Sequence, residues 1–253
     1  MEIIPIELSV TNCYLIKTAN NYILIDTGYE YDWELFCSKM MKAHGSVSQI
    51  SHIILTHHHD DHCGLLHHIL AENPSIHVVM SSRCKELIAT GENDQTHGGG
   101  YVNNRIHTLV RFKQFYVSLV LKKTVDKSTN LKFPPYQFRN GDILVGGGTT
   151  LREIGIPLDG EFIETPGHTV DSISILLDDG TCFVGDAAAN FLQFAGTKYC
   201  VIFICDMNEY YTSWKKLITK SAAQIFPAHG KPFSVDKLKK NLGKNKVQNI
   251  VSK

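Results

Sequence analysis

One stretch of this chain, T-H-H-H-D-D-H-C-G over residues 56–64, constrains its fold and chemistry more than any other. Most of its side chains are histidine or aspartate, which are common metal ligands. The apolar run at 53–55 predicts a buried strand end before it, and residues 64–70 have the apolar spacing of a helix. The stretch is therefore predicted to be a strand-to-helix turn on which a scaffold can hold metal ligands rigidly.

Within this turn, the pattern H-x-H-x-D-H is formed by His57, His59, Asp61 and His62. A turn that aims all four side chains at one ion is crowded, whereas two ions a few ångström apart can share them. We expect His57 and His59 to bind one ion, and Asp61 and His62 to bind the other. A solvated histidine-rich loop or an adventitious metal-binding tract is the alternative.

Three further positions share a local pattern in which an apolar strand ends in one His or Asp beside a glycine. They are His168 in T-P-G-H-T, Asp186 in V-G-D-A and His229 in P-A-H-G. Glycine at such points lets backbone segments approach closely. A lone histidine at a strand end is more often structural than a ligand, but three such positions beside the histidine-rich turn favour a metal centre.

The rest of the chain is typical of a globular α/β protein, with 253 residues, 43% of them hydrophobic and 20% charged. Alternating strands and helices favour this class. Strands are expected at residues 8–16, 22–25, 52–56 and 76–80, with further strand-like segments through 154 and at 162–164, and helices are expected at 32–44 and 82–89. The N-terminus lacks a signal-peptide pattern, no apolar run is long enough for a membrane span, and seven scattered cysteines do not suggest a disulfide framework. We therefore expect a cytoplasmic protein without membrane contact.

The neutral formal charge conceals an asymmetry. Residues 101–140 contain eight Lys or Arg and one Asp, and residues 231–253 contain seven Lys and one Asp. The remainder is correspondingly acidic. A basic segment near a metal centre favours an anionic small-molecule substrate, although solvated surface lysines explain it equally well. No aromatic-plus-basic pattern typical of a nucleic-acid groove is present, so a nucleic-acid partner is not expected.

Taken together, the motifs from Asp26-Thr27-Gly28 to His229 resemble those of the metallo-β-lactamase superfamily. The resemblance implies an α/β (α+β) fold, a four-layer αββα sandwich forming a single domain over residues 1–253. It also implies two Zn²⁺ ions per chain, with Mn²⁺ or Fe²⁺ compatible with the same ligands. Asp26 would orient a ligand histidine.

The resemblance also assigns each ligand to an ion. The first ion would be held by His57, His59 and His168, the second by Asp61, His62 and His229, and Asp186 would bridge them. Asp186 stands where the best-known zinc lactamases carry Cys, so antibiotic hydrolysis is not expected as the main function. His59 stands where flavodiiron oxidoreductases carry Glu, and the 24 residues after His229 are too few for the glutathione-binding domain of glyoxalase II enzymes.

The span from His62 to His168 exceeds the family minimum, and the excess falls near 95–138, which we interpret as a helical insertion. An apolar stripe on its predicted helix, over 101–123, consists of Leu109, Phe112, Tyr116 and Leu119. This stripe is expected to pack over the mouth of the metal site or against a second subunit, which would form a homodimer.

The function that the resemblance implies is a dinuclear-metal-dependent hydrolase. A metal-bridging hydroxide would attack an ester, lactone or thioester, and Asp61 would pass a proton to the leaving group. A phosphodiesterase or nuclease of the same fold is the first alternative, and a mononuclear iron dioxygenase or metal-binding sensor is the second. Other residues have these expected roles: Cys63 buried in the core, His67 and His68 solvated on a helix, and Asp171 and Ser172 capping a loop or holding His168. A place at the substrate mouth is the less favoured alternative for His97 and Tyr101.

Overall fold

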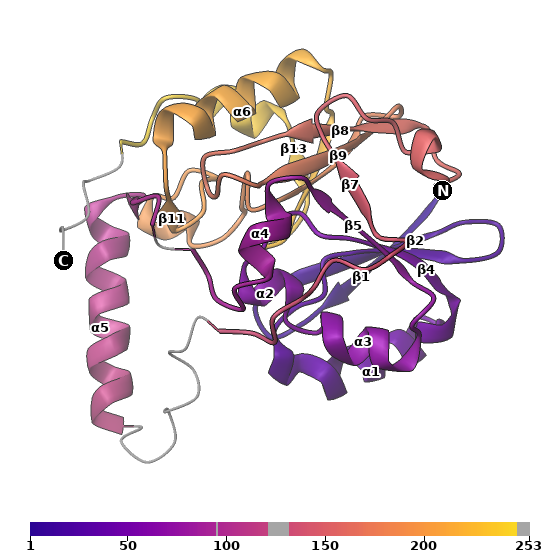
Figure 1. Ribbon diagram of the computed structural model, residues 1–253. Helices are drawn as coiled ribbons and strands as arrows, with labels where there is room; N and C mark the ends of the chain where they lie inside the picture. The colour runs from indigo at the N-terminus through magenta and orange to yellow at the C-terminus, as the bar shows by residue number, and fades with distance from the viewer. Residues whose placement is uncertain (95, 121–131, 247–253) are drawn as a thin grey trace.

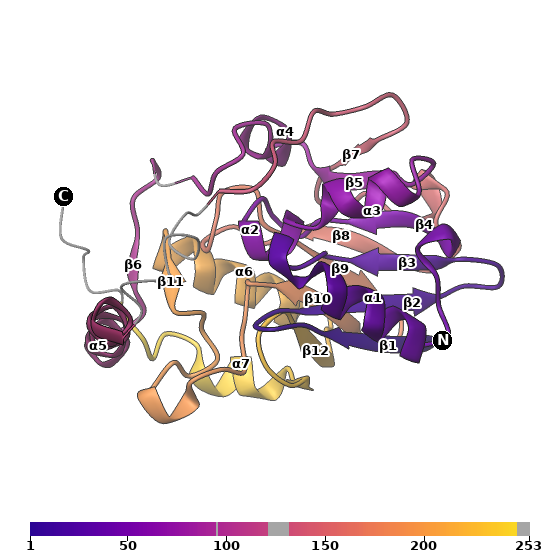
Figure 2. The same cartoon turned by 90° about the horizontal axis from the view of Figure 1, so that it is seen from below.

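Two mixed β-sheets pack face to face in the computed structural model, which describes residues 1–94, 96–120 and 132–246. Helices α1 (Trp33–Lys42) and α3 (Leu66–Glu72) lie on one side of the pair of sheets, and α6 (Met207–Thr219) lies on the other (Figures 1 and 2). This arrangement confirms the predicted αββα sandwich.

The first sheet contains six strands that are adjacent in the order in which they occur along the chain. They are β1 (Glu2–Glu7), β2 (Asn12–Lys17), β3 (Tyr22–Ile25), β4 (Ile50–Ile54), β5 (His77–Ser81) and β7 (Ile143–Val145). β2 is antiparallel to both of its neighbours, β1 and β3, and β4, β5 and β7 continue parallel to β3. The predicted strand over 8–16 was partly wrong, because residues 8–11 turn the chain between β1 and β2.

The second sheet has the strand order β13-β12-β10-β9-β8. Its strands are β8 (Gly160–Glu164), β9 (Ile173–Leu177), β10 (Thr181–Gly185), β12 (Gln224–Pro227) and β13 (Phe233–Ser234). Only β10 and β12 form a parallel pair here, so both end at the same edge of the sheet. A separate short ribbon pairs β6 (Gly100–Tyr101) with β11 (Phe203–Ile204).

The remaining helices are short, apart from α5. They are α2 (Asp60–Cys63), α4 (Cys84–Ile88), α5 (Asn104–Val120) and α7 (Asp236–Asn241), with 3₁₀ turns η1 (Glu30–Asp32), η2 (Val47–Gln49), η3 (Arg152–Ile154) and η4 (Gln193–Ala195). Ile154 was expected in a strand but lies in η3, which ends at Gly155 with a φ of 82°. Among the helices of the described ranges, none has both the length and the apolar character needed to cross a bilayer.

The alternation of side chains along β2 explains why there are four layers. Tyr14 and Ile16 point into the cluster between the two sheets, where they join Phe162 and Phe183 of the second sheet. The intervening Cys13 and Leu15 point the other way, into the cluster beneath α1 and α3. Both faces of the sheet are therefore buried along β2, and the neighbouring β3 (Y-I-L-I) is buried at every position.

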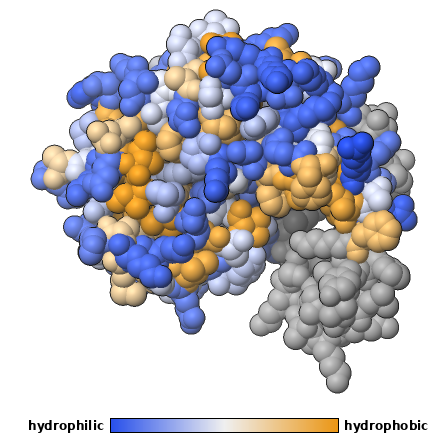
Figure 3. Space-filling view, turned by 180° about the vertical axis from the view of Figure 1, so that it is seen from behind, coloured by the Kyte–Doolittle hydropathy of each residue, from blue (hydrophilic) through white to orange (hydrophobic). Residues whose placement is uncertain are grey.

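The predicted insertion helix is present as α5, which extends along one side of the molecule (Figure 1). Ile106 is buried, but Leu109 and Phe112 are 40% and 68% exposed, and Figure 3 shows hydrophobic surface beside the residues drawn in grey. The side chains of Tyr116 and Leu119 lie outside the described part of the chain. The expectation that the stripe packs on this chain is therefore wrong for Leu109 and Phe112.

Candidate metal centre

The histidine-rich turn connects β4 to α2 and then to α3. His57 and His62 are almost completely buried in it. Gly64 ends α2, and a Cβ at this position would lie 2.6 Å from the Glu30 nitrogen and 2.8 Å from the Gly28 oxygen. Only glycine permits that close approach, so Gly64 lets the turn pack directly against the segment that follows β3.

The other three predicted ligands follow strands of the second sheet. His168 comes after β8, Asp186 directly after β10, and His229 shortly after β12. Gly185 has a φ of 49°, and its Cβ would lie 2.3 Å from the Thr56 hydroxyl oxygen. This glycine therefore brings Asp186 against the histidine-rich turn of the other sheet.

The structure brings all seven predicted ligands together in two adjoining groups. In the first group, the ligand atoms of His57, His59 and His168 all lie within 4.8 Å of one another. In the second, Nε2 of His229 is 3.2 Å from Oδ2 of Asp61, and Nε2 of His62 is 3.7 Å from the same oxygen.

The Asp186 carboxylate lies between these groups. Its Oδ2 is 3.3 Å from Nε2 of His168, a member of the first group. Its Oδ1 is 3.3 Å from Nε2 of His229 and 3.6 Å from Nε2 of His62, both of the second group. One carboxylate thus presents one oxygen to each group, as a bridging ligand would.

Hydrogen bonds to the outer ring nitrogens orient these histidines. Nδ1 of His168 donates to the Phe203 carbonyl at 2.9 Å, and Nδ1 of His229 donates to the Val10 carbonyl at 3.1 Å. A carbonyl can only accept, so the hydrogen is on Nδ1 and the lone pair of a neutral ring is on Nε2, inside the site. Nδ1 of His62 is likewise 2.8 Å from Oδ2 of Asp26, the carboxylate expected to orient a ligand histidine.

The two groups differ in their proton affinity. Burial and neighbouring imidazoles lower the pKa of His57 and His59, and burial lowers that of His168, so these rings are neutral near pH 7. Burial would also lower the pKa of His229, but Asp186 and Asp61 overcome it and raise the pKa to about 10. A cation entering the second group must therefore displace protons.

The arrangement fits a divalent cation. His57 Nε2, His62 Nε2 and Asp186 Oδ1 are buried and have no hydrogen-bond partner within the described residues. Leaving buried polar atoms unpaired is costly unless another ligand satisfies them. Imidazole and carboxylate ligands together suit zinc, and they also admit manganese or iron.

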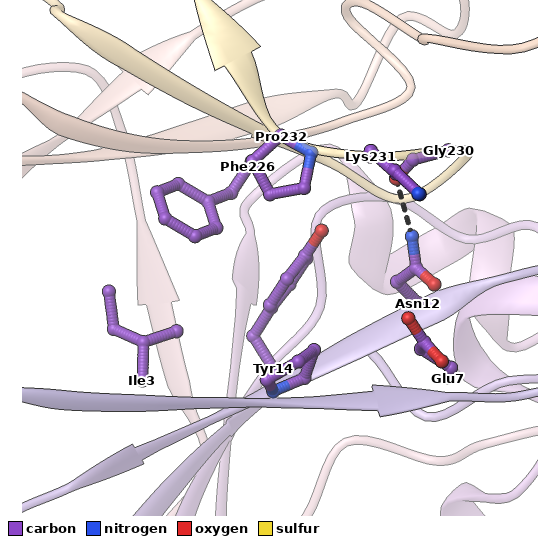
Figure 4. A pocket seen from close by; sticks show the side chains of 9 residues that line it. Ile3, Glu7, Asn12, Tyr14, Phe226, Gly230, Lys231 and Pro232 are labelled. Carbon is purple, nitrogen blue, oxygen red and sulfur yellow. Dashed lines mark hydrogen bonds between the residues drawn. The ribbon is translucent and has the colours of Figure 1, made fainter.

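Sequence reasoning missed a support formed by the turn between β1 and β2. The Thr11 hydroxyl donates to Oδ2 of Asp61 at 3.1 Å, and the preceding Val10 carbonyl holds His229. Asn12 donates from its side chain to the Gly230 carbonyl at 2.8 Å, a bond drawn in Figure 4. Nothing in the local sequence around 10–12 marks it as part of a metal centre.

His58, the middle histidine of the turn, has a structural role. Its Nδ1 is 2.9 Å from Oδ1 of Asp171, and its Nε2 accepts from the backbone nitrogen of Asp94 at 3.0 Å. Asp171 therefore holds His58 and not His168, which corrects one of the two expected roles. Ser172 fits the expected loop cap, because its hydroxyl is 2.6 Å from that of Thr169.

The other singled-out residues lie around the centre. Cys63 is buried, as expected, and its thiol contacts the His58 carbonyl. His97 pairs with Asp94, and Tyr101 stacks on His107. A place at the substrate mouth stays the less favoured alternative for both residues.

The sequence profile of the Metallo-beta-lactamase superfamily matches residues 6–229. This chain therefore belongs to that superfamily.

The solved structures that resemble it show the same fold at low identity. A metallo-beta-lactamase family protein of Thermus thermophilus has a TM-score of 0.65 at 17% identity. The match covers 96% of this chain and 78% of the Thermus thermophilus chain. An archaeal superfamily member of Sulfolobus tokodaii has a TM-score of 0.61 at 19% identity, covering 100% and 90%.

Relatives by sequence are distant. The lactamase-like protein adaB of Aspergillus niger is 28% identical over 226 residues, which cover 88% of this chain and 51% of the relative. The beta-lactamase-like protein 2 homolog of Caenorhabditis elegans is 26% identical over 232 residues, covering 89% and 58%. The thioesterase pkgB of Emericella nidulans is 37% identical over 95 residues, covering 36% and 27%. The chain thus spans little more than half the length of the longest-matching relatives.

Proposed function

We propose that this chain is a dinuclear-metal-dependent hydrolase of an ester, lactone or thioester. The observation that carries the proposal is the position of Asp186. Its two carboxylate oxygens lie 3.3 Å from Nε2 of His168 and 3.3 Å from Nε2 of His229, which belong to different ligand groups. A site for one ion does not need a carboxylate that faces two separate groups of ligands.

When bound, two divalent cations would lower the pKa of a water between them and polarise the acyl oxygen of the substrate. The chain itself positions the ligands and shields two of them from water, since His57 and His62 are almost fully buried. Asp61 uses Oδ2 to contact Thr11 and His229. Its other oxygen would carry a proton toward the leaving group.

Among acyl substrates, a thioester has the most direct support, because the relative pkgB is named a thioesterase. That match covers 36% of this chain, so lactones and oxygen esters belong in the same test. A phosphodiester is the second candidate, favoured by the excess of Lys and Arg over residues 101–140.

The first experiment is metal analysis of the purified chain, followed by a panel of thioesters, lactones, esters and phosphodiesters. Two zinc or manganese ions per chain and acyl hydrolysis are expected. Asp186→Ala should abolish hydrolysis and lower the metal content, whereas His168→Ala should mainly deplete the first ion. Asp178→Ala, a change of an exposed aspartate beyond β9, is the matched control and should keep both ions.

One iron per chain would contradict the dinuclear proposal and support the dioxygenase alternative. Retention of two ions and full activity by Asp186→Ala would also refute it. The rate should rise with pH and level off near neutrality or slightly below, because the attacking water must be deprotonated. A rate that is flat from acid to neutral pH, with chemistry limiting, would argue against that nucleophile.

A further inference from the structure

A separate group of potential metal ligands lies outside the centre described above. Glu30 begins η1, and His67 and His68 lie in the first turn of α3. One ligand atom from each lies within 4.8 Å of the other two. Nε2 of His67 is 3.7 Å from Oε1 of Glu30, and the two imidazole centroids are 3.9 Å apart. Small side-chain rotations would bring all three ligand atoms onto one cation.

The neighbouring aromatic side chains hold one of these donors in place. The His68 ring stacks on Trp33 at a centroid distance of 5.1 Å and an angle of 15°. Trp33 in turn stacks on Phe36 at 6.0 Å, and Phe36 is completely buried. Because His68 is packed against an anchored ring, it loses less conformational freedom when it binds a ligand.

The charges at this site also suit a cation. Partial burial and the adjacent His68 lower the pKa of His67, so its ring is neutral near pH 7 and can donate a lone pair. Glu30 contributes the negative charge. Two imidazoles and one carboxylate favour zinc, nickel, cobalt or copper over magnesium or calcium, which prefer oxygen ligands.

We propose that Glu30, His67 and His68 form a peripheral site for one transition-metal dication, of which zinc is the expected occupant. The ion would join two segments that already touch, since a Cβ on Gly64 would lie 2.6 Å from the Glu30 nitrogen. One segment precedes α3, and the other follows Thr27, whose backbone nitrogen donates to the His62 carbonyl at 2.8 Å. The peripheral ion thus ties the loop that supports His62 to α3.

This site does not depend on the hydrolase proposal, and a zinc titration tests it directly. The chain is loaded with zinc, freed of excess metal by gel filtration and titrated with Zn²⁺ in a calorimeter. We expect one further ion per chain, bound more weakly than the ions of the main centre. Glu30→Gln should lower the affinity for this additional zinc ion at least tenfold, and the double variant His67→Asn/His68→Asn should abolish its binding.

His44→Asn is the matched control. It removes a histidine elsewhere on the surface at a φ of 53°, a conformation that asparagine tolerates well, so the additional ion should still bind. Zinc should also raise the Tm of the loaded parent, raise that of loaded Glu30→Gln less, and leave that of the loaded double variant unchanged. The proposal is overturned if the parent binds no additional zinc, or if Glu30→Gln and the double variant bind it as the parent does. Hydrolysis by Glu30→Gln should match the parent, which separates this outcome from failure of the proposed function.

Discussion

The hydroxyl of Thr11 donates a 3.1 Å hydrogen bond to Oδ2 of Asp61, 50 residues further along the chain. Thr11 is fully buried, and the same Asp61 oxygen faces Nε2 of His229 at 3.2 Å. The turn between β1 and β2 therefore positions a ligand of the second group. The first group has a different support, because His168 is held by the Phe203 carbonyl of β11.

Thr11→Val tests this support, since valine keeps the shape of threonine and removes the donor. The affinity for the second ion should fall by about tenfold or more, within the range observed when partners of metal ligands are removed. The first ion should bind as in the parent. Stepwise zinc titration against a competing chelator measures both constants. Thr11→Ser restores the hydroxyl donor and should recover most of the lost affinity. An equal loss of affinity for both ions in Thr11→Val would show that Thr11 has a merely structural role.

Asp26→Asn tests the orientation of His62. Asn has the same size and tolerates the φ of 58° found at this position. The change removes the negative charge beside Nδ1 of His62, which makes the ring a stronger electron-pair donor to a metal ion. Oδ1 of the asparagine can still accept from the Thr56 nitrogen. The affinity for the second ion should fall about 10- to 100-fold. Unchanged affinity in the same chelator competition would show that Asp26 serves only to hold the loop.

His52 in β4 predicts a pH dependence of stability that is separate from the metal ligands. Burial, with a contribution from His77, lowers the pKa of His52 from 6.5 to about 4. The unfolded chain therefore binds a proton more readily than the folded chain. The stability contributed by neutral His52 is present above pH 6.5 and is lost as the pH falls through 4.

His52→Gln should reduce this loss by about 1–3 kcal/mol between pH 6.5 and 4. Urea unfolding of both chains at several pH values measures the difference. Metal release at acid pH affects the parent and the variant alike, so it cancels in the comparison. Parallel stability curves for the two chains would contradict the prediction.

Phe112→Asp tests the exposed part of the α5 stripe, which is Leu109 and Phe112 among the described side chains. Phe112 and Leu109 are 68% and 40% exposed, and apolar surface of this kind often marks an interface. We predict a homodimer that buries the stripe, and the aspartate should dissociate it because a buried unpaired charge is costly. Sedimentation should show a monomer that still binds two metal ions. A parent chain that is monomeric at high concentration would refute the dimer.

The candidate ligands could be identified from the sequence because each lies in a short local motif. H-x-H-x-D-H occupies a single turn, and His168, Asp186 and His229 each follow an apolar strand beside a glycine. Strand ends of this kind gather at one edge of a sandwich, so local pattern and family resemblance together indicated which side chains meet. The α/β class followed from the alternation of strands and helices, and the four-layer fold followed from the same resemblance.

The contacts that orient those ligands were decided only by the tertiary structure. Thr11 reaches Asp61 across 50 residues, and His58 reaches Asp171 across 113. Such pairs depend on strand register and on how the two sheets pack, and neither leaves a signal in the sequence around either partner. For the same reason His67 and His68 look like solvated helix positions until folding brings Glu30 and Trp33 beside them. Short-range sequence patterns specify the donors, whereas long-range packing specifies where each donor points.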